Sequence, residues 1–522
     1  MMTDTGSGDK FAQRTFSNMA TEIAYVLVAT LNGLFMVPFF KDELGLAAYA
    51  IIPLATSVTA YVTVMSDSFS EAVNRFFIIS LRKGDHEDSL LTFNTSVRAM
   101  LKLSVVVLPV MAIVAYVSPY VFSIGDSSRA DVQVMFLMTL WSTMIFAFGT
   151  CFNNTFMAEN KMTVINALRI FYLLSQIVMI VMFFATSTPS LVHIGVAYLF
   201  SAVMYSVFSF ALMRRNYPFL KYRRGMNDPD RLKNIGNLSG WSIVNKVGSL
   251  FFLQASLIIT NIFLGVEAEG HLSFVTTMVS MVGTSCMMFS NVFSPHFYDS
   301  YASDNMIRMA NISRVGISFV GMVIAMPLAY VCVFSPQILT VWVGASEAFM
   351  SDVVWIMFSV LTLHYALYVL TPISTIVLKA RPAALQVLFC GILNIVLTLF
   401  VVMFTDWGLK GVALAWVASM SIRSVIAFPM LNANILKTSL KDILVPQWKS
   451  MALFVLSAII LYGTSVVFEM PSNLLVIAIM FLVLFAIYLF LAARVMFTKS
   501  DREEVSRFMP SSVSKIFRIL FR

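Results

Sequence analysis

The sequence predicts an all-α polytopic membrane protein of about 14 transmembrane helices, with both termini in the cytoplasm. Two observations support this fold class. The chain of 522 residues is 59% hydrophobic and only 12% charged, whereas a soluble domain carries about 25% charged residues. In addition, its 35 Lys and Arg residues fall almost entirely in alternate gaps between the apolar stretches. We therefore expect a bilayer to be the main solvent of this chain.

The alternation of the cations also predicts the orientation. Counted from the N-terminus, the even-numbered gaps hold only Lys41, Arg129 and Lys410, while acidic residues occur in both kinds of gap. Cytoplasmic loops of membrane proteins carry an excess of Lys and Arg. The odd-numbered gaps and both tails are thus predicted to be cytoplasmic, in a multi-pass protein of the cell (inner) membrane.

Fourteen apolar stretches have the length that a helix needs to cross the bilayer, which is roughly 20 residues for about 30 Å of hydrocarbon. In chain order they are 15–39, 46–67, 97–123, 132–157, 162–185, 191–213, 238–264, 272–294, 315–335, 353–378, 383–404, 411–430, 451–468 and 473–494. The predicted outer connections are short, such as 40–45 and 405–410. We therefore expect the protein to act through its helical bundle.

A basic connector at mid-chain divides the predicted molecule into two lobes. We interpret it as a linker that sets topology, with contact to anionic lipid headgroups as the alternative. Its cations are Arg214, Arg215, Lys221, Arg223, Arg224, Arg231 and Lys233. The predicted organisation is a cytoplasmic N-terminus (1–14), an N-lobe (15–213), the linker (214–237), a C-lobe (238–430), a final pair of spans (431–497) and an amphipathic cytoplasmic tail (498–522).

An internal repeat relates the two predicted lobes. The sixth and twelfth spans open on the same three residues, Gly195-Val196-Ala197 and Gly411-Val412-Ala413. The other span boundaries match at a similar shift. Because six is an even number, both lobes keep the same orientation, as in transporters built from parallel repeats.

Motifs for enzymatic chemistry are missing from the sequence. It contains no Gly-rich phosphate-binding loop, no metal-spaced His/Cys cluster and no nucleophile elbow. We therefore predict that the protein is not an enzyme, needs no cofactor or metal, and binds no nucleic acid. The four cysteines fall within apolar stretches and are interpreted as small core residues: Cys151, Cys286, Cys332 and Cys390.

Charges inside the predicted spans are the main functional candidates. A charge at the centre of a transmembrane helix costs about 2.5–3.5 kcal/mol on insertion scales, so it should face a partner or water. All of them lie on the predicted cytoplasmic side, either embedded (Glu22, Asp67, Arg169, Lys246 and Arg423) or at the boundary (Glu71, Arg75 and Arg98). As a set they predict a polar vestibule open to the cytoplasm, although each one alone also fits an interhelical tie or a snorkelling side chain.

The first helix of each lobe carries one embedded charge, and the two charges have opposite sign. We expect Glu22 and Lys246 to approach each other when the cytoplasmic side closes. Polar residues along the same helices are predicted to line a path between the lobes, with interhelical hydrogen bonding as the alternative: Asn18, Asn32, Asn245, Gln254 and Asn261. Gating or ion coupling is assigned to Glu22, Asp67, Glu71 and His364, although His364 also fits a hydrogen-bonded packing residue.

Several segments resemble one known family of transporters. The arrangement of spans as six, six and two, the repeated Gly-Val-Ala openings and three short motifs are similar to the polysaccharide-transport (Wzx-type) branch of the multidrug/oligosaccharidyl-lipid/polysaccharide (MOP) exporter superfamily. The motifs are Gly45-Leu46-Ala47-Ala48-Tyr49, Asn74-Arg75-Phe76 and Lys83-Gly84-Asp85. The resemblance extends over nearly the whole chain.

This resemblance implies two six-helix lobes around a central cavity that opens alternately to each side of the membrane. It implies a polyprenyl-(pyro)phosphate-linked oligosaccharide as substrate and glycan polymerases or glycosyltransferases as further partners beside the lipid bilayer. Cations of the cavity would then meet the lipid phosphate: Arg75, Arg98, Arg169, Lys246 and Arg423. Related lipid flippases cluster arginines on the first helix, whereas this chain has only Arg14 there and carries Glu22 instead.

Two other functions stay open at this point. A cation-coupled drug or metabolite antiporter of the same superfamily would use embedded acids to bind its cation, but normally has twelve spans. A non-transporting membrane scaffold for glycan synthesis would tolerate mutation of the embedded charges, whereas a flippase would lose activity.

Overall fold

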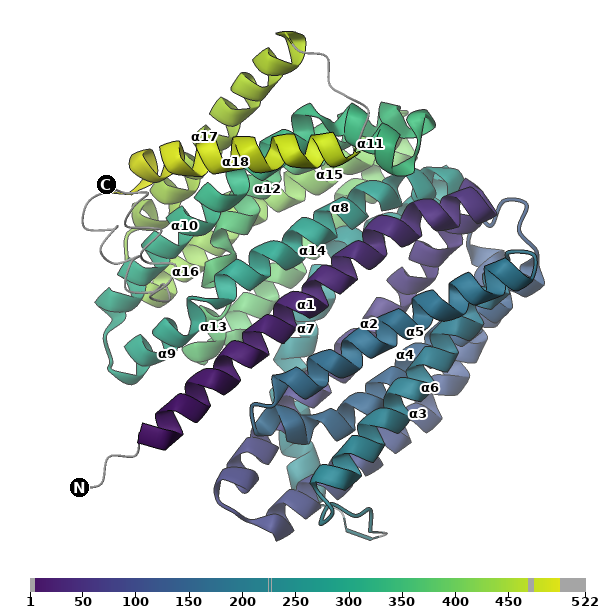
Figure 1. Cartoon of the computed structure of the whole chain (residues 1–522), viewed down its shortest axis with the longest axis vertical. Coiled ribbons are helices and arrows are strands. Elements are labelled where there is room, and N and C mark those ends of the chain that lie inside the picture. The colour runs from purple at the N-terminus through teal and green to yellow at the C-terminus, as the bar shows by residue number, and fades with distance from the viewer. Residues whose placement is uncertain (1–4, 224, 227, 468–473, 498–522) are drawn as a thin grey trace. The chain divides into compact units, whose positions relative to one another are not determined.

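The computed structural model describes residues 5–223, 225–226, 228–467 and 474–497 (Figure 1). Every regular element in these residues is helical, and 14 helical segments are long and apolar enough to cross a membrane. The predicted all-α fold with about 14 membrane spans is therefore confirmed, while the cytoplasmic location of both termini stays a prediction. The predicted amphipathic tail, 498–522, lies outside the described residues.

The first six spans are single helices, and their bounds are as follows. They are α1 (Thr5–Leu44), α2 (Leu46–Arg82), α3 (His86–Val121), α4 (Arg129–Ala158), α5 (Met162–Thr186) and α6 (Leu191–Asn216). Helix α7 (Pro229–Leu264) follows the connector, and α8 (Val266–Asn291) continues into the short α9 (Ser294–Ala302).

Several later spans are interrupted helices. Helix α10 (Met306–Val333) precedes α11 (Ser335–Val343), and the next span is composed of η1 (Ala345–Met350), α12 (Ser351–Ala366), η2 (Leu367–Leu370) and α13 (Ile373–Ile376). Helix α14 (Ala380–Phe404) is continuous. The twelfth span joins α15 (Gly408–Ser421) to α16 (Phe428–Leu436) through a π-helical segment, η3 (Ile422–Ala427), and α17 (Leu440–Val467) and α18 (Leu474–Met496) complete the described chain.

The second and third spans extend well beyond the apolar stretches that predicted them. Helix α2 runs to Arg82 and α3 begins at His86, so only the turn 83–85 separates them. Gly84 takes φ 70° there, a conformation that suits glycine. Asp85 then caps α3 by accepting a hydrogen bond from the Asp88 backbone N–H at 2.9 Å. Hydrophobicity predicted the membrane crossing, but turn and cap residues decide where the helices end.

Contacts within the chain divide it into two compact units. Unit 1 contains residues up to 250 together with 264–270, and unit 2 contains 251–263 and the residues from 271 onward. Helix α7 is therefore shared, with its first part in unit 1 and its second part in unit 2. The division between the compact units falls inside this helix.

In unit 1, α4 packs most extensively against α6, and the two helices lie side by side (Figure 1). A glycine on each helix permits this close approach. A Cβ atom on Gly149 would lie 2.7 Å from Ser206 Oγ, and one on Gly195 would lie 3.2 Å from the Met135 Cα. Tyr205 is buried at this interface.

In unit 2, α10 packs against α17 and α12 and is one of the most buried spans. Gly321 of α10 faces Ser450 of α17, and a Cβ atom at Gly321 would overlap the Ser450 side chain. Ser450 has little freedom to move, because it is fully buried and its hydroxyl donates a 2.9 Å hydrogen bond to the Pro446 carbonyl.

Gly321→Ala should therefore destabilise unit 2 by about 1–3 kcal/mol, the usual cost of overpacking a tight interior. Gly463→Ala is the matched control, because a Cβ atom at Gly463 of α17 meets no atom within 4 Å. Thermal unfolding of the purified variants in detergent measures the difference. Equal melting temperatures for the two variants would contradict the packing of α10 on α17.

Candidate functional site

Unit 1 brings four of the predicted charged residues together around Asp67. Lys246 Nζ of α7 lies 2.6 Å from Glu71 Oε1 of α2, and Ser242 Oγ donates to Glu71 Oε2 at 3.0 Å. Asp67 lies within electrostatic range of Lys246, Glu71 and Arg169. We call Asp67, Glu71, Arg169 and Lys246 the unit 1 charge cluster.

The cluster is formally neutral, with two acids and two cations, and it is partly open. Asp67 is exposed, as is the Glu71 side chain at 55%, while the Lys246 side chain is 29% exposed. Partly exposed ion pairs contribute only about 0–1 kcal/mol. The Glu71–Lys246 bond can therefore be broken or exchanged at small cost.

Helices α1 and α5 form a second polar contact in unit 1. Asn166 Nδ2 donates to Glu22 Oε2 at 2.8 Å, and one turn further the Arg169 guanidinium lies 5.5 Å from the centre of the Tyr25 ring. Asn18 binds across the same interface, accepting from the Thr163 backbone N–H at 3.1 Å. In this conformation Glu22 is paired with Asn166 and Lys246 with Glu71, so their mutual approach stays a prediction for another state.

The remaining predicted residues of unit 1 are not joined to the cluster. Arg75 is exposed and Arg98 partly exposed, and no hydrogen bond or ion pair among the described residues connects either to the cluster. Asn32 and Asn245 are partly buried. In unit 2, Gln254 is partly buried and Asn261 is fully buried. The proposed path along these amides stays a prediction.

Unit 2 holds a cationic site around Arg423, within the π-helical segment η3. The guanidinium lies 5.3 Å from the Phe252 ring centre and 6.0 Å from that of Phe428. It also lies within electrostatic range of Tyr368 and Cys390. Short π-helical segments occur frequently at functional sites.

Arg423 has no acidic partner among the residues that the structure describes. Its Nε atom is buried and makes no hydrogen bond within the same part of the chain. Contact with aromatic faces compensates such a charge only in part. The site is therefore a partly buried cation with free donors, a composition that suits an anionic group.

The neighbouring polar side chains hold the backbone around Arg423 in place. His364 Nδ1 lies 3.1 Å from Ser424 Oγ, and Gln447 Nε2 donates to the carbonyls of Ser424 and Leu363, both at 2.9 Å. His364 is buried. These contacts favour the interpretation of His364 as a hydrogen-bonded packing residue that positions the π-helical turn.

Asn394 of α14 fastens the second part of α7 within unit 2. Its Nδ2 donates to the Phe251 carbonyl at 2.8 Å and to Ser256 Oγ at 3.0 Å, while its Oδ1 accepts from Ser419 Oγ at 3.0 Å. The first part of α7 is held in unit 1 through Lys246 and Ser242. This distribution of contacts explains why the division between the units falls within α7.

An apolar groove lies between α10, α17 and α18 in unit 2. Its volume is about 210 Å³ and its lining is Met326, Leu453, Leu456, Ser457, Ile460, Leu461, Leu484, Ile487, Tyr488, Leu491 and Ala492. Two tyrosines tie α18 to α10 beside it: Tyr488 donates to the Met322 carbonyl and Tyr330 donates to the Ile477 carbonyl, both at 2.8 Å. The final pair of spans thus forms a groove that suits a hydrocarbon chain.

Sequence reasoning missed two embedded acids. Glu269 and Glu347 lie between predicted spans, in the gaps 265–271 and 336–352, yet both are buried. Glu347 Oε2 lies 2.6 Å from His271 Nδ1, whereas the Glu269 carboxyl oxygens have no hydrogen-bond partner in the described chain. Residues 271 and 347 are too far apart in sequence for any spacing rule to pair them. The four cysteines are buried and free, which confirms that prediction.

Comparison with known proteins identifies one curated relative and several solved structures with a similar fold. No family model matches the sequence. The chain is 24% identical over 425 residues to an uncharacterized membrane protein, EpsK of Bacillus subtilis (strain 168), covering 80% of this chain and 83% of that protein.

The fold of this chain matches two solved structures over nearly the whole length of each. The lipid II flippase MurJ in an inward closed conformation has a TM-score of 0.64 at 14% identity, covering 89% of this chain and 98% of that one. An inward-facing multidrug resistance MATE family transporter of the MOP superfamily has a TM-score of 0.63 at 14% identity, covering 80% and 96%. At these identities the likeness shows the fold: this chain has the fold of MOP superfamily transporters.

A double-mutant cycle tests the Glu71–Lys246 pair. Glu71→Lys and Lys246→Glu should each lower the melting temperature, and the swapped pair should recover most of the loss, corresponding to a coupling of about 0.5–1 kcal/mol. The same measurement on Glu22→Lys with Lys246→Glu is the comparison. Better recovery with Glu22 than with Glu71 would show that Lys246 pairs mainly with α1 in solution.

Proposed function

We propose that this protein is a flippase that moves a polyprenyl-(pyro)phosphate-linked oligosaccharide from the cytoplasmic to the outer leaflet by alternating access. The single observation that carries the proposal is the unpaired, partly buried guanidinium of Arg423. A membrane protein that keeps such a charge without an acid near it needs an anion to complete the site. A phosphate that bridges a lipid and a sugar is such an anion.

Arginine also has the right shape for this group. Its planar guanidinium presents parallel N–H donors that bind phosphate oxygens in pairs. In unit 2 the contacts of His364, Ser424 and Gln447 restrain the backbone around Arg423. The guanidinium itself lies over the Phe252 and Phe428 rings, and its N–H donors would bind the phosphate.

The groove between α10, α17 and α18 would hold the lipid tail. The large headgroup must cross a wet cavity, while the polyprenyl chain stays in hydrocarbon. A groove lined mainly by Leu, Ile and Met side chains provides that surface at the final pair of spans. The likeness to a lipid II flippase, which covers 89% of this chain, supports a lipid-linked substrate.

The unit 1 charge cluster would respond to the substrate headgroup. Lys246 is paired with Glu71, and Asp67 lies within electrostatic range of Lys246 and Arg169, so a diphosphate would compete with carboxylates for these cations. Exchange of partners at this weak pair links headgroup entry to a change of conformation. Glu22, which accepts a hydrogen bond from Asn166, is the acid available to Lys246 in the alternate state.

A cation-coupled antiporter is the second candidate. The exposed Asp67 and the likeness to a MATE family transporter favour it. Such a protein would move a drug or metabolite against a proton or sodium gradient and would not need Arg423. Glycan polymerases or glycosyltransferases are proposed as partners of the flippase only.

The first test is reconstitution of the purified protein into vesicles with a fluorescent polyprenyl-diphosphate oligosaccharide. Wild-type protein should expose labelled lipid to an externally added quencher faster than empty vesicles. Arg423→Gln should slow this by about 30-fold or more, since losing one partner of a desolvated charged contact costs roughly 2–5 kcal/mol. Arg308→Gln, at an exposed position of α10, is the matched control.

Arg423→Lys separates charge from shape in the same assay. It should restore part of the rate, because lysine keeps the charge but not the paired donors. No acceleration by wild-type protein over empty vesicles would reject the flippase function for this substrate. Transport of an organic cation that depends on Asp67 and not on Arg423 would support the antiporter instead.

A second test fills the groove for the lipid tail. Ile460→Trp places a large ring among the groove residues, whereas Ile459→Trp places the same ring on an exposed position of α17 outside the lining. Ile460→Trp should lower the flipping rate several-fold relative to Ile459→Trp at equal melting temperature. Equal rates would mean that the tail does not use this groove.

A further inference from the structure

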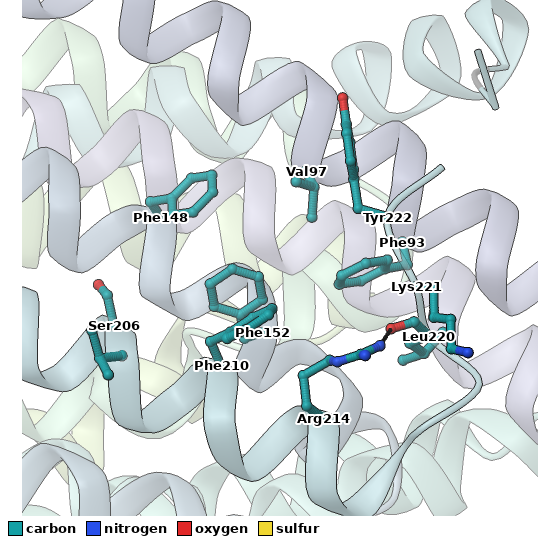
Figure 2. Close-up of a pocket in the computed structure, with 11 residues that line it drawn as sticks. Phe93, Val97, Phe148, Phe152, Ser206, Phe210, Arg214, Leu220, Lys221 and Tyr222 are labelled. Atoms are coloured by element: carbon teal, nitrogen blue, oxygen red, sulfur yellow. Dashed lines mark hydrogen bonds between the residues drawn. The ribbon is translucent and has the colours of Figure 1, made fainter. Parts of the chain in front are cut away.

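A larger groove in unit 1 has no role in the proposed transport. It lies against α3, α4 and α6 beside the basic connector and has a volume of about 700 Å³, within the range of about 300–1,000 Å³ that is typical of ligand sites. Figure 2 shows Phe148, Phe152 and Phe210 along one part of it and Arg214, Leu220 and Lys221 at the other end.

The body of this groove suits a hydrocarbon chain. Phe93 and Phe152 are buried in its floor, while Val207 and Phe210 are exposed at its rim. Its one hydroxyl among these helices, on Ser206, already donates to the Ile145 carbonyl at 2.7 Å. A polar ligand would therefore find few partners here, and an acyl chain would find aromatic surface.

The end beside the connector is cationic. Arg214 and Lys221 line it, both are exposed, and the lining contains no acidic residue. Arg214 Nη1 donates to the Leu220 carbonyl at 3.2 Å, which fixes the guanidinium beside the groove and leaves further N–H groups for another acceptor.

The connector is held in position by buried polar contacts, so its cations are not on a loose segment. Asn94 of α3 is fully buried; its Oδ1 accepts from the Arg223 backbone N–H at 2.6 Å and its Nδ2 donates to the Lys221 carbonyl at 3.1 Å. Arg231 forms an ion pair with Asp88 and a hydrogen bond with Thr92. These contacts keep Lys221 at the groove end.

We propose that this groove binds one anionic phospholipid of the surrounding leaflet, with an acyl chain along the phenylalanines and the headgroup phosphate at Arg214 and Lys221. The hydrocarbon chain of an anionic phospholipid matches the aromatic body of the groove, and its negative headgroup matches the cationic end. Basic side chains at a membrane surface attract such lipids. The site is separate from Arg423 and from the groove for the substrate tail, and it does not depend on the flippase proposal.

Native mass spectrometry of the full-length protein tests the site with phosphatidylglycerol and with phosphatidylcholine of the same chains. Wild-type protein should prefer phosphatidylglycerol. Arg214→Ala with Lys221→Ala should weaken phosphatidylglycerol binding by about 25-fold, or roughly fivefold for each cation. Lys437→Ala with Lys441→Ala removes the same charge from exposed positions elsewhere and should have little effect.

A second variant tests the hydrocarbon part. Val207→Trp fills the groove, and Val203→Trp, one turn away on α6 and outside the lining, is its control. Only Val207→Trp should remove the bound lipid, at unchanged thermal stability. The proposal would be overturned if each variant lost as much lipid binding as its control. It would also be overturned if the wild-type protein showed no preference for phosphatidylglycerol. Tighter binding of a polyprenyl phosphate that Val207→Trp abolishes would reassign the groove to a substrate tail.

Discussion

Hydrocarbon solvates neither charges nor hydrogen-bonding groups, and the polar residues of this protein are arranged around that constraint. Glu22 is paired with Asn166, Lys246 with Glu71, and the amide of Asn394 with two backbone carbonyls and two hydroxyls. Arg423 departs from this pattern, since its guanidinium lies over the Phe252 and Phe428 rings and has no acidic partner in the described chain. A charge kept without an acidic partner suits an anion from outside the chain, which is why we propose that Arg423 binds a substrate phosphate.

The charged sites of the two units differ in net charge and in exposure. The cluster of unit 1 is neutral and partly open, so its ion pairs are weak and exchangeable. The site of unit 2 is cationic, and its backbone is restrained by a π-helical turn and by Gln447. Under the proposed function, unit 1 would exchange its ion-pair partners while Arg423 of unit 2 would bind the anion. Helix α7 belongs to both units, so a change at Lys246 acts on the same helix that carries Phe252 beside Arg423.

Some residues of the candidate site could be selected from the sequence, and others could not. Arg423 was selected from sequence because a charge inside an apolar stretch is expensive, and it occupies a distinctive site. Lys246 and Asp67 were selected for the same reason and lie in one cluster. Glu269 and Glu347 could not be selected, because a carboxylate near the end of an apolar stretch is expected in a solvated loop. Only the tertiary packing shows that these two side chains are buried. The position of the linker backbone could not be predicted, because it depends on hydrogen bonds to the buried amide of Asn94, more than a hundred residues away in the chain.

Sequence alone determined the solvent of this chain, the number of its spans and the residues that are costly to bury. These follow from composition and from helix length against bilayer thickness, which are local quantities. The tertiary structure alone decided which partner each charge has, that Arg423 has no acidic one, and that α7 is divided between two units. Those outcomes depend on contacts between residues far apart in the chain. No spacing in the sequence encodes them, because helices of similar hydrophobicity can pack in many ways, and side-chain shape selects among them.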